Sequence, residues 1–268
     1  MQGVREPADR RHFLTMIGGA LGVYGVDCVR LWHSILGMPG FVRSALAYER
    51  LSRSEPGMRL HLRHLRPYLA DWFGSAGAID AEYFYQDWWV ARQVLHRDPV
   101  NHLDIGSRLD GLVSHLLVFR SVEFLDVRQL QLDVPGFSCK VGDARDLECY
   151  ESASFESVSC LHAIEHIGLG RYGDPVDPAG PAKAASEICR VVAPGGYAYV
   201  SAPIGRERLE FNGQRVFAPR TMLEMFSGLH LEMFSAIDDN GRFWEDSNPD
   251  SFMSARDACG IFVFRCRD

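Results

Sequence analysis

A short apolar run that ends in glycine and turns into a helical pattern constrains this chain more than any other stretch. Leu103 and Ile105 belong to a predicted buried strand, Gly106 ends it, and apolar residues then recur at helical spacing. α/β proteins use a strand, glycine turn and helix in this order to present backbone N–H groups to an anionic ligand. The next apolar run ends in Asp126, where a second strand would place a carboxylate on a ribose diol. The sequence therefore predicts a nucleotide-cofactor half-site.

From residue 100 onward, short apolar strands alternate with helical patterns. This alternation predicts a parallel sheet joined by right-handed crossovers. The predicted strands are 101–105, 122–126, 137–141, 156–161, 196–202, about 231–237 and 260–266, and the predicted helices are 108–118, 181–192 and 219–228. The last two strands fit an antiparallel hairpin. The predicted fold class is therefore α/β, a Rossmann-like, seven-stranded, mostly parallel sheet with an N-terminal helical extension.

Residues 1–97 lack this alternation and are predicted to be helical. Apolar residues repeat at helical spacing with a break at 37–40, and the basic segment 59–69 suits a further helix. An aromatic-rich helix follows, with Asp80 as its N-cap. The predicted organisation is an extension or lid at 1–97 and a cofactor-binding domain at 98–268.

Charge and cysteine usage narrow the class of partner and the compartment. The formal net charge of -7 lacks the basic character of nucleic-acid binders. The seven cysteines are scattered, odd in number and without a CxxC pair, which is typical of reduced thiols in a cytoplasmic protein. We therefore expect a cytoplasmic protein that binds a small molecule, with no nucleic-acid partner and no stable membrane span. The oligomeric state stays open.

The N-terminal residues 9–14, followed by a glycine-rich apolar run, resemble a twin-arginine export signal. Against export, Asp27 and Arg30 interrupt the run, no clean cleavage site follows, and the run is too short to span a bilayer. The alternatives are an amphipathic helix that packs on the main domain and one that contacts a membrane surface.

A second carboxylate, Asp143, follows the third predicted strand. There it can accept a hydrogen bond from an adenine amino group while the next backbone N–H donates to a ring nitrogen. The alternative is that Asp143 caps a turn.

The turn after Gly106 lacks the second glycine of a dinucleotide fingerprint. A cofactor without a pyrophosphate, such as S-adenosylmethionine, does not need that glycine.

The loop after the fourth predicted strand is rich in titratable residues. His162, Glu165 and His166 fall at the carboxyl edge of the sheet, where open α/β folds bind ligands. The same residues match the HxxEH pattern of zinc peptidases, which requires a continuous helix and a third protein ligand. Because the pattern here straddles a strand end, we predict no metal site.

Five motifs follow one another in order, namely Asp104-Ile-Gly106, Asp126, Gly142-Asp143-Ala144, Glu165-His166 and Ala193-Pro194-Gly195-Gly196. Together they resemble the motifs of class I S-adenosylmethionine-dependent methyltransferases. The segments 106–111, 162–178 and 203–219 resemble more narrowly a subfamily known mainly as a domain of unknown function. The resemblance implies the fold and the cofactor, with Gly106 facing the methionine portion, Asp126 the ribose hydroxyls, and Asp143 with Ala144 the adenine. It does not imply the acceptor.

The predicted cofactor-binding residues are Asp104, Gly106, Ser107, Arg108, Asp126, Val127, Asp143, Ala144, Leu161 and His162. Methyl transfer is an in-line displacement, so the protein mainly aligns the nucleophile and excludes water, and some acceptors also need a general base. The catalytic candidates are His166, which we place first, and Glu165, His162, Tyr172 and Asp174; alternatively, Glu165 and His166 only brace the loop. The acceptor-binding candidates are Arg171, Asn212, Arg215 and Tyr85, the last from an aromatic helix that is either a lid over the sulfonium or plain core.

We predict an enzyme that transfers a methyl group from S-adenosylmethionine to a small-molecule acceptor and releases S-adenosylhomocysteine. Two alternatives stay open, because a fold does not determine a reaction. In one, attack at a different carbon of the sulfonium closes a ring or transfers an aminocarboxypropyl group, releasing methylthioadenosine in the biosynthesis of a small amino-acid-derived metabolite. In the other, the chain is a catalytically silent binding protein, although such a protein would have no need of Asp126 and Asp143.

Overall fold

The structure is a computed structural model that describes residues 22–53, 59–74 and 79–267. The chain divides into two compact units, residues 1–78 and 79–268, which are described separately below. Residues 9–21 of the export-like segment lie outside the described residues. Within the described ranges, no helix has both the length and the apolar character needed to cross a membrane.

The first unit contains one long helix, α2 (Cys28–Leu51), which continues through Pro39. The predicted break at 37–40 is therefore wrong. A Cβ atom on Gly37 would lie 2.0 Å from the carbonyl oxygen of Leu69, so only glycine lets the returning chain approach the helix this closely. This tertiary packing supports the helix at a point where local propensity alone predicts its end.

The segment 59–69, predicted as a helix, forms only a 3₁₀ turn at Leu62–His64, and a second 3₁₀ turn follows at Asp71–Phe73. Pro67 explains the difference, because proline disfavours helical geometry in the residue before it. The segment instead runs back along α2, where the rings of His33 and Phe73 stack with centroids 4.9 Å apart.

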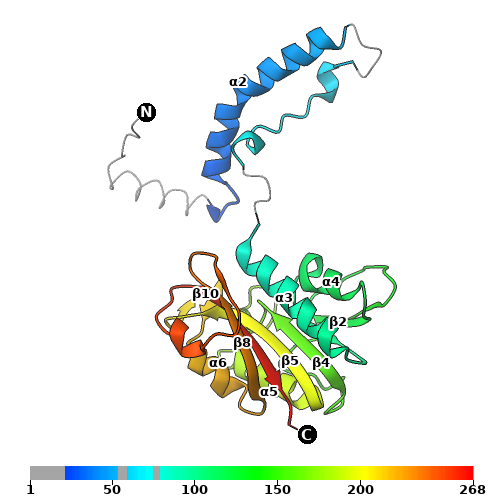
Figure 1. The fold of residues 1–268 in the computed structure, drawn as a ribbon, viewed down its shortest axis with the longest axis vertical. Helices are drawn as coiled ribbons and strands as arrows, with labels where there is room; N and C mark the ends of the chain where they lie inside the picture. The colour runs from blue at the N-terminus through cyan, green and yellow to red at the C-terminus, as the bar shows by residue number, and fades with distance from the viewer. Residues whose placement is uncertain (1–21, 54–58, 75–78, 268) are drawn as a thin grey trace. The chain divides into compact units, whose positions relative to one another are not determined.

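The second unit is built on an eight-stranded sheet with the strand order β3-β2-β1-β4-β5-β10-β8-β9 (Figure 1). The strands are β1 (Leu103–Ile105), β2 (Val122–Asp126), β3 (Phe137–Val141), β4 (Phe155–Leu161), β5 (Val192–Ile204), β8 (His230–Ile237), β9 (Phe243–Trp244) and β10 (Ala258–Arg265). Strands β1 to β5 pair in parallel, and β10 is antiparallel to both β5 and β8. The predicted α/β sheet with an antiparallel hairpin at its end is confirmed, and β9 adds a two-residue edge strand. A separate hairpin joins β6 (Arg208–Glu210) to β7 (Gln214–Val216).

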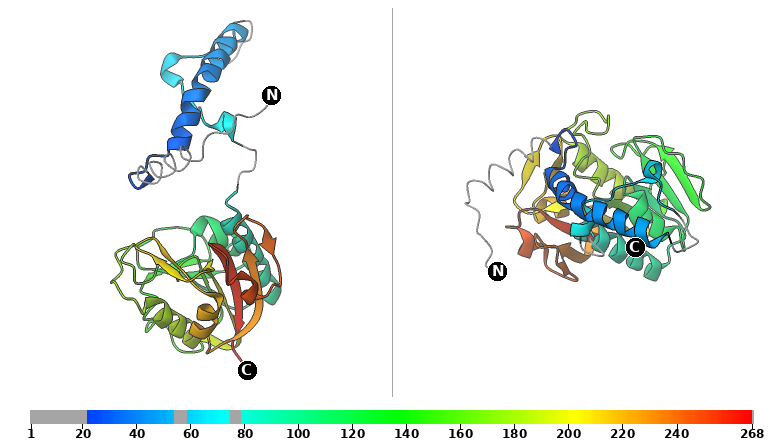
Figure 2. Two further views of the ribbon diagram at one scale, coloured as in Figure 1. Left: turned by 90° about the vertical axis from the view of Figure 1, so that its left-hand side faces the viewer. Right: turned by 90° about the horizontal axis from the view of Figure 1, so that it is seen from above.

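Helices cover both faces of this sheet (Figure 1, Figure 2). One face carries α3 (Ala81–Arg97), a π-helical turn (Leu109–Val113) and α4 (Ser114–Leu116), and the other carries α5 (Gly180–Val191) and α6 (Pro219–Met225), with a 3₁₀ turn at Pro249–Phe252. Tyr199 and Val200, neighbours in β5, belong to the two separate hydrophobic clusters on these faces. Successive side chains of a strand point to opposite faces, so the sheet divides the core into two layers.

The aromatic helix α3 belongs to the second unit, so the predicted boundary after residue 97 differs from the division in the structure. Its N-cap is Asp80 as predicted, and the Asp80 side chain accepts a hydrogen bond from the N–H of Glu82. Trp89 and Val94 are fully buried against the sheet. This buried face joins the helix to the core of the second unit.

The buried carboxyl group of Asp87 on α3 makes stability depend on pH. A Cβ atom on Gly111 would lie 2.1 Å from Asp87 Oδ2, so the glycine allows this close packing. Burial raises the pKa of Asp87 to about 7. Between about pH 4 and pH 7 the folded state therefore keeps a proton that the unfolded chain has already released. As a result, the free energy of unfolding falls as the pH rises from about 4 to 7.

Asp87→Asn should remove this pH dependence. The unfolding free energy of the variant minus that of the wild type is expected to rise across this window by up to about 1.4 kcal/mol per pH unit. Denaturant unfolding at a series of pH values measures this difference, which also cancels the contributions of other titrating groups. A difference that stays constant with pH would contradict the prediction.

Candidate functional site

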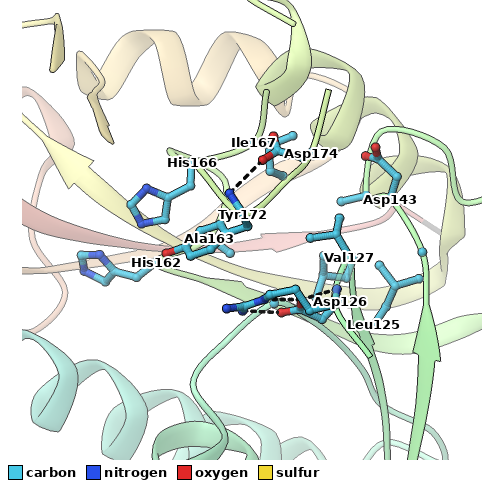
Figure 3. Close-up of a pocket in the computed structure, with 15 residues that line it drawn as sticks. Leu125, Asp126, Val127, Asp143, His162, Ala163, His166, Ile167, Tyr172 and Asp174 are labelled. Atoms are coloured by element: carbon cyan, nitrogen blue, oxygen red, sulfur yellow. Dashed lines mark hydrogen bonds and ion pairs between the residues drawn. The ribbon is translucent and has the colours of Figure 1, made fainter. Parts of the chain in front are cut away.

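The connections of the sheet diverge between β1 and β4, and ligands of open α/β folds bind at the carboxyl ends of strands beside such a point. Two adjoining cavities of about 100 and 620 Å³ lie there, and Figure 3 shows the residues that line the smaller one. Of the predicted residues, the smaller cavity is lined by Gly106, Asp126, Val127, Asp143, Ala144, His162, His166, Tyr172 and Asp174. The larger is lined by Gly106, Ser107, Arg108, Asp126, His162, His166, Arg171 and Tyr172. Residues from separate predicted motifs therefore meet in one place.

The glycine turn after β1 has a conformation that favours glycine. Gly106 has a φ of +69°, and its N–H donates to the carbonyl oxygen of Leu125 over 2.9 Å. A Cβ atom there would lie 3.3 Å from the Cβ of Ala163 across the cavity. A side chain at this position would therefore strain the turn and narrow the cavity.

Asp104 lies behind this turn and does not line either cavity. Its fully buried carboxylate accepts hydrogen bonds from the Ser107 N–H over 3.0 Å and from the Ser159 hydroxyl over 2.5 Å. Burial raises the pKa of Asp104 to about 6. The Ser107 hydroxyl oxygen in turn accepts from the N–H of Leu161, another predicted cofactor residue that lines neither cavity. These contacts hold the turn in place.

Asp126 and Asp143 each pair with an arginine two residues later. Asp126 Oδ1 accepts from both the N–H and Nε of Arg128, at 2.8 and 2.9 Å. Within the described ranges, Oδ2 accepts only from Nη2 of Arg128, at 2.9 Å. Since a carboxylate oxygen has two lone pairs, Oδ2 keeps one acceptor position. The pairing with Arg145 lowers the pKa of Asp143. The prediction missed both arginines, although the repeated Asp-x-Arg pattern after two strands was a usable signal.

The walls of the smaller cavity between these two carboxylates are largely apolar. Leu125, Val127, Ala144 and Ile167 line it. A Cβ atom on Gly142 would lie 2.9 Å from Leu125 Cδ1, so this glycine lets the leucine pack closely. The smaller cavity is therefore an apolar slot between two carboxylates. This arrangement suits a flat heterocycle that is joined to a diol.

His162 and the buried Glu165 form the floor of the site. His162 Nδ1 lies 3.0 Å from Glu165 Oε1, and Nε2 lies 3.3 Å from the sulfur of Cys259. Burial alone would lower the pKa of His162, but the contacts with Cys259 and Glu165 outweigh it and raise that pKa well above its usual value. Glu165 Oε2 is buried and has no hydrogen-bond partner in the described part of the chain. Cys259 was not among the predicted residues, because no pattern in the sequence indicates that β10 lies beside His162.

His166 is held as a neutral imidazole whose Nε2 lies 3.7 Å from Glu165 Oε1. Its Nδ1 lies 2.8 Å from the carbonyl oxygen of Gly213, which can only accept, so Nδ1 carries the hydrogen and Nε2 carries the lone pair. Burial lowers the pKa of His166, and the positive charge of Arg171 lowers it further. In Figure 3 the rings of His162 and His166 lie at the end of the cavity opposite Asp143. This arrangement allows His166 to act as a general base.

Asp174 lines the smaller cavity, but its carboxylate already bonds the loop backbone. Oδ2 accepts from the N–H groups of Gly168 at 2.7 Å and Gly170 at 3.4 Å, and Oδ1 accepts from that of Tyr172 at 3.3 Å. These bonds fit a brace for the loop better than the predicted catalytic role. The loop closes through a hydrogen bond from the Asp177 N–H to the Gly168 carbonyl oxygen.

Gly168→Ala should destabilise this loop. Gly168 has a φ of +77°, and a Cβ atom there would lie 2.1 Å from the backbone oxygen of Asp177. We expect a loss of more than about 1 kcal/mol in unfolding free energy, measured by chemical denaturation. Gly173→Ala is the matched control, because Gly173 has a φ of +87° but no atom within 4 Å of the added Cβ. Equal losses in the two variants would show that the backbone clash contributes nothing.

Three predicted acceptor-binding residues line neither cavity. Arg215 donates from Nη1 to the carbonyl oxygens of Glu165 and Ile167, at 3.2 and 2.7 Å, and so supports the loop from behind. Asn212 is exposed, and the ring of Tyr85 stacks on Phe243 with centroids 5.4 Å apart.

Tyr83 takes the place expected of Tyr85. Its ring lies 4.5 Å from the Arg108 guanidinium and 5.0 Å from the His162 ring, and it lines the larger cavity. Tyr83 lies one helical turn before the buried Gln86 and Asp87, so the helical period could have selected it. Gln214, which also lines this cavity, was missed without any such signal.

Residues 162–166 form a turn, which is not the continuous helix that the zinc-peptidase pattern requires. In the part of the chain that the structure describes, no group of three or more His, Cys, Asp or Glu side chains is placed to hold a metal ion.

Comparison with known proteins gives a family match and several structural likenesses. The family described as "Caenorhabditis protein of unknown function, DUF268" matches residues 136–245. No curated protein matches the sequence. The [4+2]-cyclase SpnF is similar in structure, with a TM-score of 0.50 and 15% identity over 70% of this chain and 85% of that one.

Two further solved structures are similar at lower TM-scores. The YcgJ protein from Bacillus subtilis has a TM-score of 0.49 and 12% identity, over 69% of this chain and 99% of that one. The N-methyltransferase NodS from Bradyrhizobium japonicum, in complex with S-adenosyl-L-homocysteine, has a TM-score of 0.45 and 14% identity, over 71% and 94%.

At these identities a structural likeness shows the fold and not the activity. The likeness to SpnF covers more than two thirds of this chain. The sheet itself has β4 and β5 at its centre, and β10 runs antiparallel between the parallel strands β5 and β8. The second unit of this chain therefore has the fold of the class I S-adenosylmethionine-dependent methyltransferases.

Proposed function

We propose that the second unit binds S-adenosylmethionine and transfers its methyl group to a small-molecule acceptor. The observation that carries this proposal is the convergence of three strand ends on one cavity. The turn at Gly106 follows β1, Asp126 ends β2, and Asp143 follows β3. A protein that kept the fold without a ligand would have no reason to keep this set together.

The residues around the smaller cavity fit the cofactor. Asp126 keeps an acceptor position on Oδ2 for a ribose hydroxyl, and the apolar slot at Leu125 and Ile167 suits an adenine ring. Asp143 with Ala144 would bind the adenine edge. The turn at Gly106, continuing into the larger cavity, would hold the methionine portion.

When bound, S-adenosylmethionine supplies an electrophilic methyl group on a sulfonium. The residues of the chain then have to position an acceptor and remove its proton. His166 can take that proton at Nε2, since its Nδ1 hydrogen is committed to Gly213. The ion pair between His162 and Glu165 fixes the floor of the site. The ring of Tyr83, a residue of α3, limits the access of water to it.

A small-molecule acceptor agrees with the dimensions and charge of the protein. The larger cavity of about 620 Å³ is within the usual size of small-ligand pockets. The net charge of -7 opposes binding to nucleic acid. SpnF, with a similar fold, is a [4+2]-cyclase, so this fold also serves reactions other than methyl transfer. The second candidate is therefore an enzyme that consumes S-adenosylmethionine without methyl transfer.

Incubation of the purified chain with S-adenosylmethionine alone tests the proposal. Mass spectrometry of the nucleosides should find the cofactor intact and bound, with S-adenosylhomocysteine forming only after an acceptor is added. Methylthioadenosine formed without an acceptor would instead establish cyclisation or aminocarboxypropyl transfer. A bound cofactor that no acceptor ever consumes would favour the silent binding protein.

A further inference from the structure

Three arginines line the larger cavity, and two of them are neutralised by carboxylates. Arg108 Nη2 lies 2.9 Å from Asp110 Oδ2, and Arg128 Nε lies 2.9 Å from Asp126 Oδ1. Arg171 has no ion pair with any Asp or Glu among the described residues. The nearby His162 pairs with Glu165, and Glu82 Oε2 also lies 3.9 Å from His162 Nε2. Among the described residues, Arg171 is therefore the one arginine of the larger cavity whose charge no carboxylate neutralises.

Arg171 and His166 are fixed side by side by a single acceptor. The Gly213 carbonyl oxygen accepts from Arg171 Nη1 and from His166 Nδ1, each over 2.8 Å, and these two nitrogens lie 3.4 Å apart. The Arg171 guanidinium also lies 5.2 Å from the Tyr172 ring centroid. Nη1 makes the only hydrogen bonds that the structure shows for this guanidinium in the described part of the chain, so Nε and Nη2 keep their donors for a ligand.

We propose that the acceptor carries one anionic group, a carboxylate or a phosphate, which binds Arg171 and places the nucleophile of the acceptor beside His166. This inference rests on the proposed transferase function and names its substrate class. A guanidinium matches the geometry of both anions through paired N–H donors. The single uncompensated charge selects an acceptor with one anionic group over a neutral one. The short distance between Arg171 and His166 selects a small acid whose amine or hydroxyl lies a few bonds from that group.

Anion titration of the complete chain saturated with S-adenosylhomocysteine tests this inference. Acetate and inorganic phosphate are the anionic probes, and acetamide is the neutral match of acetate in shape. We expect one of the anions to bind measurably by calorimetry while acetamide does not. Tighter binding of acetate assigns a carboxylate acceptor, and tighter binding of phosphate assigns a phosphorylated one.

Variants of Arg171 locate the binding. Arg171→Gln should weaken binding of the preferred anion at least about tenfold, while Arg171→Lys, which keeps the charge but not the paired donors, should lose less. Arg220→Gln is the matched control, because Arg220 pairs with Asp250 and lines neither cavity. Affinity for S-adenosylhomocysteine should stay within about threefold of the wild type in all three variants, which also shows that they fold.

Two results would overturn the inference. One is binding of acetamide as tight as that of acetate and phosphate. The other is an anion affinity that is the same in Arg171→Gln as in the wild type. Failure of the chain to bind S-adenosylhomocysteine at all is a separate result that contradicts the proposed function itself.

Discussion

Asp126→Ala is expected to lower the affinity of the protein for S-adenosylhomocysteine by about 100-fold. The Asp126 carboxylate ends β2 at the edge of both cavities, and its Oδ2 keeps an acceptor position. A hydrogen bond to a charged group contributes roughly 1.5–3 kcal/mol, and the upper part of this range corresponds to about 100-fold in affinity. Calorimetric titration of the variant measures the loss.

Two matched variants separate the carboxylate from its ion pair. Arg128→Gln breaks the pair with Asp126 but keeps the carboxylate, so affinity should fall far less than in Asp126→Ala. Asp250→Ala removes another acid that pairs with an arginine, but Asp250 lines neither cavity, so this variant should change affinity less than about threefold. Wild-type affinity in Asp126→Ala would refute the ribose assignment.

His166→Asn is expected to lower turnover by about 10²- to 10⁴-fold, the usual contribution of a general base, with little change in cofactor affinity. Asparagine keeps a donor for the Gly213 carbonyl oxygen but removes the Nε2 lone pair. The rate of S-adenosylhomocysteine formation in the presence of an acceptor measures the effect. Turnover close to that of the wild type would assign His166 to the support of the loop.

The pH profile of the wild type provides a second measure of the same role. Burial lowers the pKa of His166, and Arg171 lowers it further against the opposing effect of Glu165. The neutral base is therefore lost only below pH 6.5, and kcat/KM should fall on the acid side of that value. An unchanged acid limb in His166→Asn would mean that another group titrates.

The strands of the second unit could be predicted because each is a local pattern. Predicted strands 122–126 and 137–141 coincide with β2 and β3, and Asp126 and Asp143 follow from where these strands end. The first unit was harder to predict, because contacts between distant residues decide it. The approach of Leu69 to Gly37 supports a helix through Pro39, and no pattern within the helix indicates that approach.

The candidate site could likewise be predicted only in part. The predicted strand ends correctly placed His162 and His166 at the carboxyl edge of the sheet, but the partners of both histidines come from distant segments. Cys259 lies on β10, and the Gly213 carbonyl that fixes His166 lies between β6 and β7. Such pairings depend on the packed fold. A single sequence therefore indicates which groups gather at the edge, and the structure shows which of them are free to react.

Titration of the complete purified chain with S-adenosylmethionine is the most direct test of the central claim. The account predicts one binding site per chain, a Kd below about 1 mM, and displacement by S-adenosylhomocysteine. Absence of binding at that concentration would contradict the claim, and the cavity at Asp126 and Asp143 would then have to serve a different ligand.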